Sequence, residues 1–254
     1  MKSDPMKRLL ILLTAITFST TSFANEKILV TVPPLYSLAA SLLEGVDTPG
    51  LLFATETEMK ANTLSSDHLK RIQKSSMVVW SGPQFETNLV SYLLQNPSFS
   101  KKSLTITETI PTFTKPDQKK EFLHANPHDM RFWLDPRLTI LALKRMSTKM
   151  VTLYPDNFER ILDNEAKLRD MIKKMEKNMQ SSLENNNLDV PLEVPDSDIL
   201  YLAWRYNLKV PKCPEAAKKQ DGFQVEFGTE LYFNMMLDIL KELKKCQGMP
   251  DLQS

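Results

Sequence analysis

Hydrophobic residues in the first part of the chain form short unbroken runs that alternate with segments of helical periodicity. The apolar run at residues 28–32 ends at Pro33-Pro34, and the apolar positions that follow it recur at helical spacing. Further runs lie at residues 50–53, 77–80 and 104–106, with helical segments at 66–74 and 86–94. Strands that alternate with helices in this way predict βαβ units and a parallel sheet.

A polar loop and two helices are predicted for the middle of the chain. Residues 111–129 are rich in Pro, Lys, Asp and His and show no periodicity, which is typical of a solvated loop. Asp135 before Pro136 predicts a helix start, because the carboxylate accepts hydrogen bonds from free N–H groups and proline needs no donor there. A second helix is expected at residues 155–184, with about 30 residues and a length of about 45 Å.

The remaining residues, 188–254, are too few for a second α/β lobe equal to the first. They contain one apolar stretch at 199–204 and one amphipathic helix at 230–245. We therefore predict an α/β protein whose parallel-sheet N-terminal lobe is joined by a long linking helix to a reduced, mostly helical C-terminal lobe. The expected boundaries are as follows: signal peptide 1–24, N-terminal lobe 25–150, linking helix 151–187 and C-terminal lobe 188–254.

The first 24 residues are typical of a secretory signal peptide. A basic start at residues 6–8 precedes an apolar core at residues 9–18, and Ser22 and Ala24 stand at −3 and −1 of a cleavage site. The apolar core is shorter than the roughly 20 residues that a membrane span needs, and no later stretch approaches that length. We expect an exported, periplasmic monomer without a transmembrane span.

Composition and charge exclude several classes of function. The chain has 32 Lys+Arg against 31 Asp+Glu, which gives no basic footprint for nucleic acid. It has six Gly and contains no phosphate-binding glycine loop, nucleophile–base motif or HExxH motif, so we do not expect an enzyme. Cys213 and Cys246 in an exported chain favour an intramolecular disulfide, and two free thiols are the alternative.

Four ordered motifs and the long helix resemble the periplasmic zinc/manganese-binding proteins of ABC transporters. The motifs lie at residues 28–39, 64–73, 77–86 and 132–136, and the last of them reads Phe-Trp-Leu-Asp-Pro. The resemblance implies two α/β lobes joined by a rigid helix, a metal held between the lobes, and delivery to an inner-membrane permease. Cys213 and Cys246 also match the disulfide that the family carries in its second lobe.

The resemblance implies a ligand set of three His and one carboxylate or water, but this chain has only three His. At the first His position of the family this chain has Lys60, whose ammonium is no ligand and repels a divalent ion. At the second position an ungapped alignment gives Arg131, whereas reading residues 129–131 as an insertion gives His128. At the third position the chain has Asp196, which is an oxygen ligand or a plain helix cap.

Two further side chains are candidate donors near these positions. Glu58 lies two residues before Lys60 and supplies a carboxylate, and His124 lies in the loop that precedes His128. The fourth ligand of the family falls where this chain lacks part of the second lobe. His68, in the first turn of a predicted helix, is expected to face solvent.

Two hypotheses follow for the function. In the first, the chain is a periplasmic solute-binding protein that captures zinc or manganese with altered and weakened ligation and passes it to an ABC permease. In the second, it is a degenerate paralogue that binds no metal and acts as a scaffold for protein contacts. A variant of the second uses Lys60 and Arg131 to capture an anion, because both side chains are good donors to carboxylate or phosphate.

Overall fold

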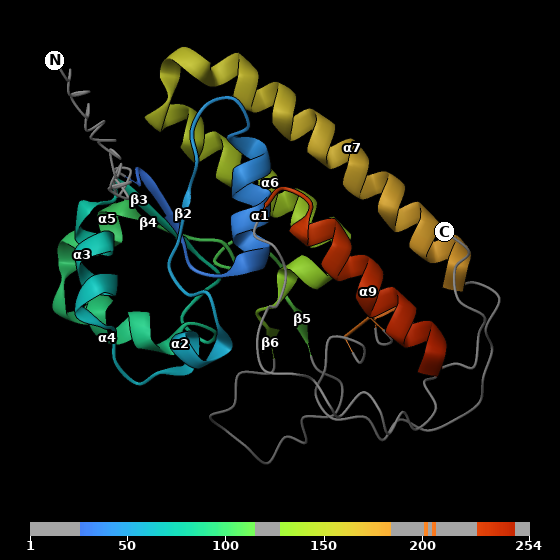
Figure 1. Cartoon of the computed structure of the whole chain (residues 1–254), viewed down its shortest axis with the longest axis horizontal. Helices are drawn as coiled ribbons and strands as arrows, with labels where there is room; N and C mark the ends of the chain where they lie inside the picture. Colours follow the sequence, from blue (N-terminus) through green and yellow to red (C-terminus); the bar gives the residue numbers. More distant parts are fainter. Residues whose placement is uncertain (1–25, 115–127, 184–200, 203–204, 207–227, 247–254) are drawn as a thin grey trace, which may run out of the picture.

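The computed structural model describes residues 26–114, 128–183, 201–202, 205–206 and 228–246, and it confirms the predicted α/β class (Figure 1). The strands are β1 (Ile28–Val30), β2 (Gly50–Leu51), β3 (Met77–Trp80), β4 (Ser103–Thr105), β5 (Phe113–Thr114) and β6 (His128–Asp129). The α-helices are α1 (Pro33–Leu42), α2 (Glu56–Lys60), α3 (Ser66–Lys74), α4 (Thr87–Gln95), α5 (Pro97–Lys102), α6 (Pro136–Leu153), α7 (Phe158–Leu183) and α9 (Leu231–Cys246). Two 3₁₀ turns, η1 (Phe132–Leu134) and η2 (Pro155–Asn157), precede α6 and α7.

Four parallel strands form the central sheet in the order β2-β1-β3-β4. Strand β2 is added on one side of β1, whereas β3 and β4 are added on the other side. Because parallel crossovers are right-handed, this change of direction places the helices of the later crossovers, α3, α4 and α5, on the opposite face of the sheet from α1. Figure 1 shows this arrangement, with α3, α4 and α5 on one side of the sheet and α1 and α6 on the other. The strands β1 and β3 are completely buried, which explains why they read as unbroken apolar runs in the sequence.

A buried carboxylate joins the carboxyl ends of β1 and β3. Glu86 accepts hydrogen bonds from the Thr31 hydroxyl at 2.6 Å, the Ser81 N–H at 2.9 Å and the Gly82 N–H at 2.9 Å. Burial raises the pKa of Glu86, and these hydrogen bonds oppose that shift. The contacts fix the loop after β3 and the start of α4.

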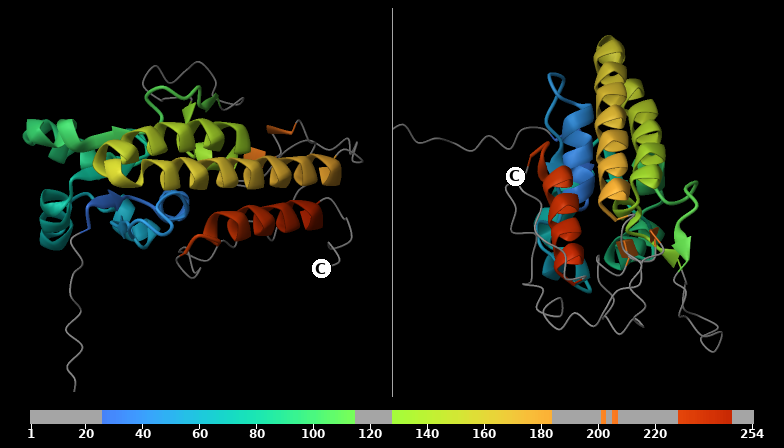
Figure 2. Two further views of the ribbon diagram at one scale, coloured as in Figure 1. Left: turned by 90° about the horizontal axis from the view of Figure 1, so that it is seen from above. Right: turned by 90° about the vertical axis from the view of Figure 1, so that its right-hand side faces the viewer.

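The helices that follow the sheet lie side by side. Both views of Figure 2 show α6 and α7 packed along each other, and α9 begins against α1. Ser37 of α1 accepts the N–H of Tyr232 at 3.0 Å and donates to the Thr229 carbonyl at 2.8 Å, so α1 caps the first turn of α9. Buried apolar residues of α9, including Met236 and Leu243, belong to the same core as those of the sheet.

Several details differ from the sequence-based predictions. Residues 111–129 were expected to be loop throughout, but β5 and β6 pair there as an antiparallel ladder. The short helices α2 and α5 were not predicted, because five or six residues are too few to show a periodicity. The capping box at the start of α2, in which Thr55 and Glu58 exchange hydrogen bonds, was the available signal. No helix in the described ranges is long and apolar enough to cross a membrane.

Candidate functional site

The candidate site lies where β6 leads through η1 into α6. Asp135 accepts the N–H of Arg137 at 2.9 Å and Pro136 occupies the first helical position, which confirms the predicted start of this helix. The hydroxyl of Thr139, one turn into the helix, donates to the backbone carbonyls of Trp133 and Asp135. These bonds hold the carboxylate of Asp135 at the N-terminal end of α6.

Arg131 and Asp129 form an ion pair immediately before η1. Nε of Arg131 lies 2.9 and 3.2 Å from the two carboxylate oxygens of Asp129, and its Nη2 lies 2.5 Å from Oδ2. The backbone N–H of Arg131 also donates to Asp129, at 3.0 Å. The side chain of Asp129 is 3% exposed and that of Arg131 is 17% exposed, so water screens this pair little.

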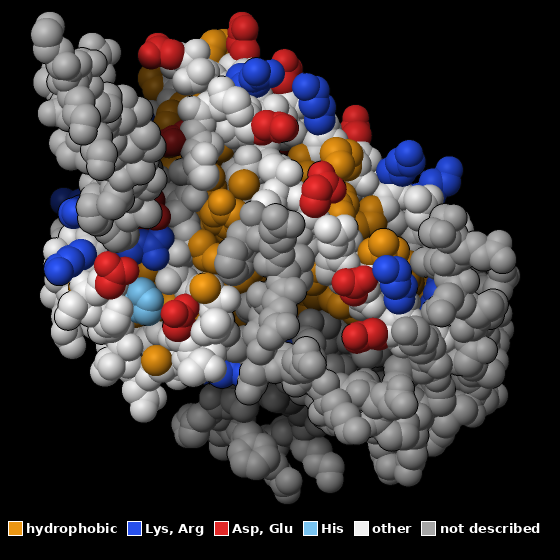
Figure 3. All heavy atoms as spheres, viewed as in Figure 1, with side chains coloured by type: hydrophobic (Ala, Val, Ile, Leu, Met, Phe, Trp, Pro, Cys, Tyr) orange, Lys and Arg blue, Asp and Glu red, His pale blue; other side chains and the backbone are white. Residues whose placement is uncertain are grey.

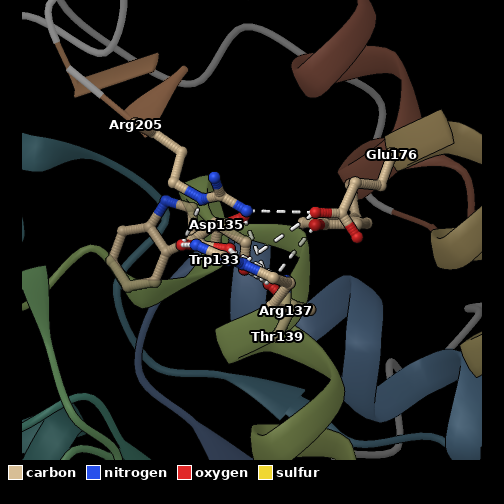
Figure 4. A network of polar contacts seen from close by, with 7 residues as sticks. Trp133, Asp135, Arg137, Thr139, Glu176 and Arg205 are labelled. Atoms are coloured by element: carbon tan, nitrogen blue, oxygen red, sulfur yellow. Dashed lines mark hydrogen bonds and ion pairs between the residues drawn. The ribbon is translucent and has the colours of Figure 1, made fainter. Parts of the chain in front are cut away.

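A second guanidinium, that of Arg205, reaches the site from the predicted C-terminal lobe. Figure 4 shows it pointing between Asp135, at the start of α6, and Glu176 of α7. Its Nε donates to Asp135 at 2.6 Å and its Nη2 donates to Glu176 at 3.0 Å. Arg137 approaches the same carboxylates at 3.4 and 4.0 Å, but its side chain is 61% exposed. Arg205 therefore links three separate parts of the chain.

Two tyrosines lie near these ion pairs: Tyr201 is buried and Tyr206 is half-buried. Burial raises the pKa of Tyr201, as do the negative charges of Asp135 and Asp129, and Arg131 and Arg205 oppose that shift. Burial likewise raises the pKa of Tyr206 to about 12, and the ring of Tyr206 lies 5.0 Å from the Arg205 guanidinium. Both phenols therefore stay neutral at physiological pH and add no charge to the site.

The charges in the site balance one another. Three carboxylates, those of Asp129, Asp135 and Glu176, face three guanidiniums, those of Arg131, Arg137 and Arg205. Within the part of the chain that the structure describes, no three His, Cys, Asp or Glu side chains are grouped so that they could hold a metal ion. The described side chains thus form an internally neutralised cluster.

The predicted site residues fall into two groups. His128 lies in β6 next to Asp129, although its side chain is outside the description, and Arg131 lies in the cluster itself. Glu58 and Lys60 are exposed on α2, and Glu58 accepts the N–H groups of Ala54 and Thr55.

Other predicted residues lie outside the described ranges. These are Asp196, His124 and Cys213, together with the side chain of Cys246, so the oxygen ligand, the loop imidazole and the disulfide remain predictions. His68 was expected to face solvent, but it is half-buried. Its ring packs edge-on against Phe53 at 5.1 Å, and its Nδ1 accepts the Ser65 N–H as part of a capping box.

Sequence reasoning missed four members of the cluster: Asp129, Arg137, Glu176 and Arg205. Glu176 stands among the many charged residues of the long helix, and nothing in the sequence distinguishes it. Arg205 had a signal, since it directly follows the apolar stretch at 199–204, and a charge so placed needs a partner when that stretch is buried.

A cleft of about 720 Å³ lies beside β4 and reaches Met130, in the segment between β6 and η1. Its lining includes Trp80 at the end of β3, Thr105 of β4, Leu93 of α4 and Met130, the residue between Asp129 and Arg131. Among the described residues that line it, Glu108 is the charged one, and it is paired with Arg145 at 2.6 Å. The cleft is therefore distinct in character from the ion-pair cluster.

Sequence comparison connects this fold to a known family. Residues 28–226 match the family described as "Zinc-uptake complex component A periplasmic". The high-affinity zinc uptake system protein ZnuA of Yersinia pestis is 20% identical over 183 residues, which are 64% of this chain and 58% of that protein.

Structural comparison gives the same fold. Zn(II)-bound AdcA from Streptococcus pneumoniae matches with a TM-score of 0.66 at 17% identity, over 89% of this chain and 59% of that one. A manganese-bound periplasmic metal-binding protein from Candidatus Liberibacter asiaticus matches with a TM-score of 0.58 at 12% identity, over 85% of this chain and 76% of that one.

The family match extends over most of the chain, although the chain spans only about three fifths of the length of ZnuA and AdcA. It covers the central sheet, the segment that runs from β6 into α6, the long helix α7 and Arg205. The similar structures include proteins bound to zinc and to manganese. The chain therefore belongs to the family of periplasmic zinc-uptake components, whose members are solute-binding proteins.

Proposed function

We propose that this protein is the periplasmic solute-binding component of an ABC transporter and that it captures zinc or manganese for a membrane permease. The observation that carries the proposal is the family match over residues 28–226, which covers the whole candidate site. The predicted signal peptide agrees with a periplasmic location. In this proposal the protein is a carrier and not an enzyme.

The metal would be held by donors that this chain supplies in its own combination. His128 in β6 and Asp196 are the principal candidates, and His124 and Glu58 are further ones. Imidazole suits zinc, and carboxylate oxygen combined with imidazole also suits manganese. With Lys60 and Arg131 at two family ligand positions, we expect weaker binding than a three-histidine site gives.

The proposal is tested by isothermal titration of residues 25–254 with zinc and with manganese. We expect a dissociation constant of about 10 μM or tighter for one of the metals, and a loss of about tenfold or more in the His128→Ala variant. His68→Ala is the matched control, because it removes an imidazole that packs against Phe53 and is not a proposed ligand. Binding weaker than about 10 μM that His128→Ala leaves unchanged would reject the proposal.

One observation favours the second candidate function, a paralogue that binds no metal. Arg131 is tied to Asp129 by several hydrogen bonds, so a family ligand position is filled by a neutralised cation. Under this alternative, neither metal gives heat of binding and the protein acts through protein contacts. The anion-binding variant is less well supported, because the guanidinium of Arg131 already has a carboxylate partner.

A further inference from the structure

We propose that the cleft beside β4 is a binding site for a small uncharged organic molecule that has an apolar body and a carbonyl oxygen. The inference goes beyond the proposed function, because such a ligand is not a metal ion. The cleft measures about 720 Å³, which is within the range of small-molecule sites in proteins. Three features of its lining define the ligand: an unpartnered donor, apolar side chains and a neutral charge balance.

The unpartnered donor is the indole N–H of Trp80, at the end of β3. Trp80 is 3% exposed, and its Nε1 is buried without a hydrogen-bond partner in the part of the chain that the structure describes. A buried N–H that lacks an acceptor is costly, and most such groups in folded proteins have one. Because Trp80 lines the cleft, a molecule held there is in a position to supply the missing acceptor.

Thr105 brings a hydroxyl to the same part of the cleft. Trp80 and Thr105 are paired in the parallel ladder of β3 and β4, and both line the cleft. Since successive side chains of a strand alternate between the two faces, paired residues of neighbouring parallel strands share a face of the sheet. The indole N–H and the hydroxyl therefore favour a ligand with a carbonyl oxygen over a purely apolar one.

The rest of the lining favours an apolar and uncharged body. Among the described residues that line the cleft, Glu108 is the charged one, and Arg145 neutralises it at 2.6 Å. A charged ligand would lose hydration without gaining an ion pair, which is unfavourable. The apolar side chains come from α4, from the segment after β4 and from the segment after β6: Val90, Leu93, Ile110 and Met130.

Hydrogen bonds hold the lining in place. The Thr107 hydroxyl donates to the Ser81 carbonyl at 2.7 Å, and the Ser81 hydroxyl donates to the Met130 carbonyl at 2.6 Å. These bonds join the loop after β3 both to β4 and to the segment between Asp129 and Arg131. A cleft that is already formed loses little free energy to reorganisation when a ligand binds.

The test uses prodan, an uncharged naphthalene whose ketone supplies the carbonyl oxygen. Fluorescence titration of residues 25–254 measures its affinity, and NMR follows the indole N–H resonances of the three Trp residues. We expect saturable binding and a shift of the indole resonance that is missing from the spectrum of Trp80→Phe. This substitution removes the donor but keeps an apolar ring, so it should weaken binding by about tenfold.

Two further variants distinguish the cleft from the surface. Thr105→Leu places a larger side chain in the cleft and should abolish saturable binding. Leu94→Ser is the matched control, because Leu94 of α4 is 75% exposed and is not among the residues that line the cleft, so the affinity should stay unchanged. Binding that survives Thr105→Leu, or that Leu94→Ser abolishes, would overturn the inference, as would a wild type that shows no saturable binding at about 100 μM prodan.

A second ligand covers the case in which Trp80→Phe does not fold. In this compound a propyl chain replaces the propionyl group of prodan, so the ketone is lost and the shape is retained. We expect the wild type to bind it about tenfold more weakly than prodan. Equal affinities for the two compounds would overturn the inference, and neither result depends on whether the protein binds zinc.

Discussion

Arg205 and Arg137 reach the same two carboxylates from different environments. The side chain of Arg205 is 10% exposed and lies 2.6 Å from Asp135 and 3.0 Å from Glu176, whereas that of Arg137 is 61% exposed and more distant. Loss of one partner of a buried ion pair lowers the free energy of unfolding much more than loss of a partner at the surface. Water replaces the lost partner only where the pair is exposed. The two arginines therefore allow a matched comparison within one cluster.

We predict that Arg205→Gln lowers the free energy of unfolding by about 3 kcal/mol, because it leaves Asp135 and Glu176 buried without their closest partner. Arg137→Gln should cost less than about 1 kcal/mol. Chemical denaturation of the two variants and the wild type at neutral pH measures both values. Similar losses for both substitutions would contradict the prediction.

The helices are held together by contacts that are distant in the sequence. Ser37 of α1 caps α9 from outside that helix, and Asn164 of α7 donates to the carbonyls of Leu42 and Glu44 at the end of α1. Each contact satisfies backbone groups that a helix end leaves unpaired. The positions of α7 and α9 on α1 thus depend on polar bonds as well as on apolar packing.

Ser37→Ala is expected to lower the free energy of unfolding by about 1 kcal/mol, the typical cost of a lost helix cap. The faster hydrogen exchange that results should be confined to the first turn of α9, near Tyr232. Ser41→Ala is the control, because its hydroxyl donates only to the Ser37 carbonyl within α1. Unchanged exchange in α9 would show that Ser37 does not act as its cap.

The C-terminal part of the chain completes the core of the N-terminal part. Tyr232, Met236, Leu240 and Leu243 of α9 are each less than 5% exposed, and they share one core with the sheet and α1. On the face that Figure 3 shows, basic and acidic side chains are interspersed along α7, which agrees with the nearly neutral net charge. The buried face of α9 shows that this C-terminal helix packs on the sheet and on α1.

A chain that ends at Leu183 should therefore lose stability and expose apolar surface on α1. Each fully buried side chain that α9 removes from water contributes about 1.5–3 kcal/mol. We expect a lower melting temperature and increased binding of a hydrophobic dye. A chain that ends at Cys246 retains α9 and should melt like the full chain, so equal melting temperatures for both truncations would contradict this view.

Local signals in the sequence were sufficient for the sheet strands, the start of α6 and the long helix. Buried parallel strands are apolar on both faces, and the carboxylate of Asp135 beside Pro136 marks a helix start through contacts within a few residues. The family motifs likewise depend on residues that are close in sequence. All of these features are local, so no knowledge of the tertiary structure was required.

The partners of the charged residues depended on the tertiary structure alone. Asp135, Glu176 and Arg205 are separated by 29 to 70 positions, and only the packing of α6, α7 and residues 201–206 brings them together. The two-residue spacing of Asp129 and Arg131 is visible in the sequence, but the burial that makes their pairing consequential is not. A charge shows in the sequence, whereas its exposure and its partner are set by elements that meet only in the fold.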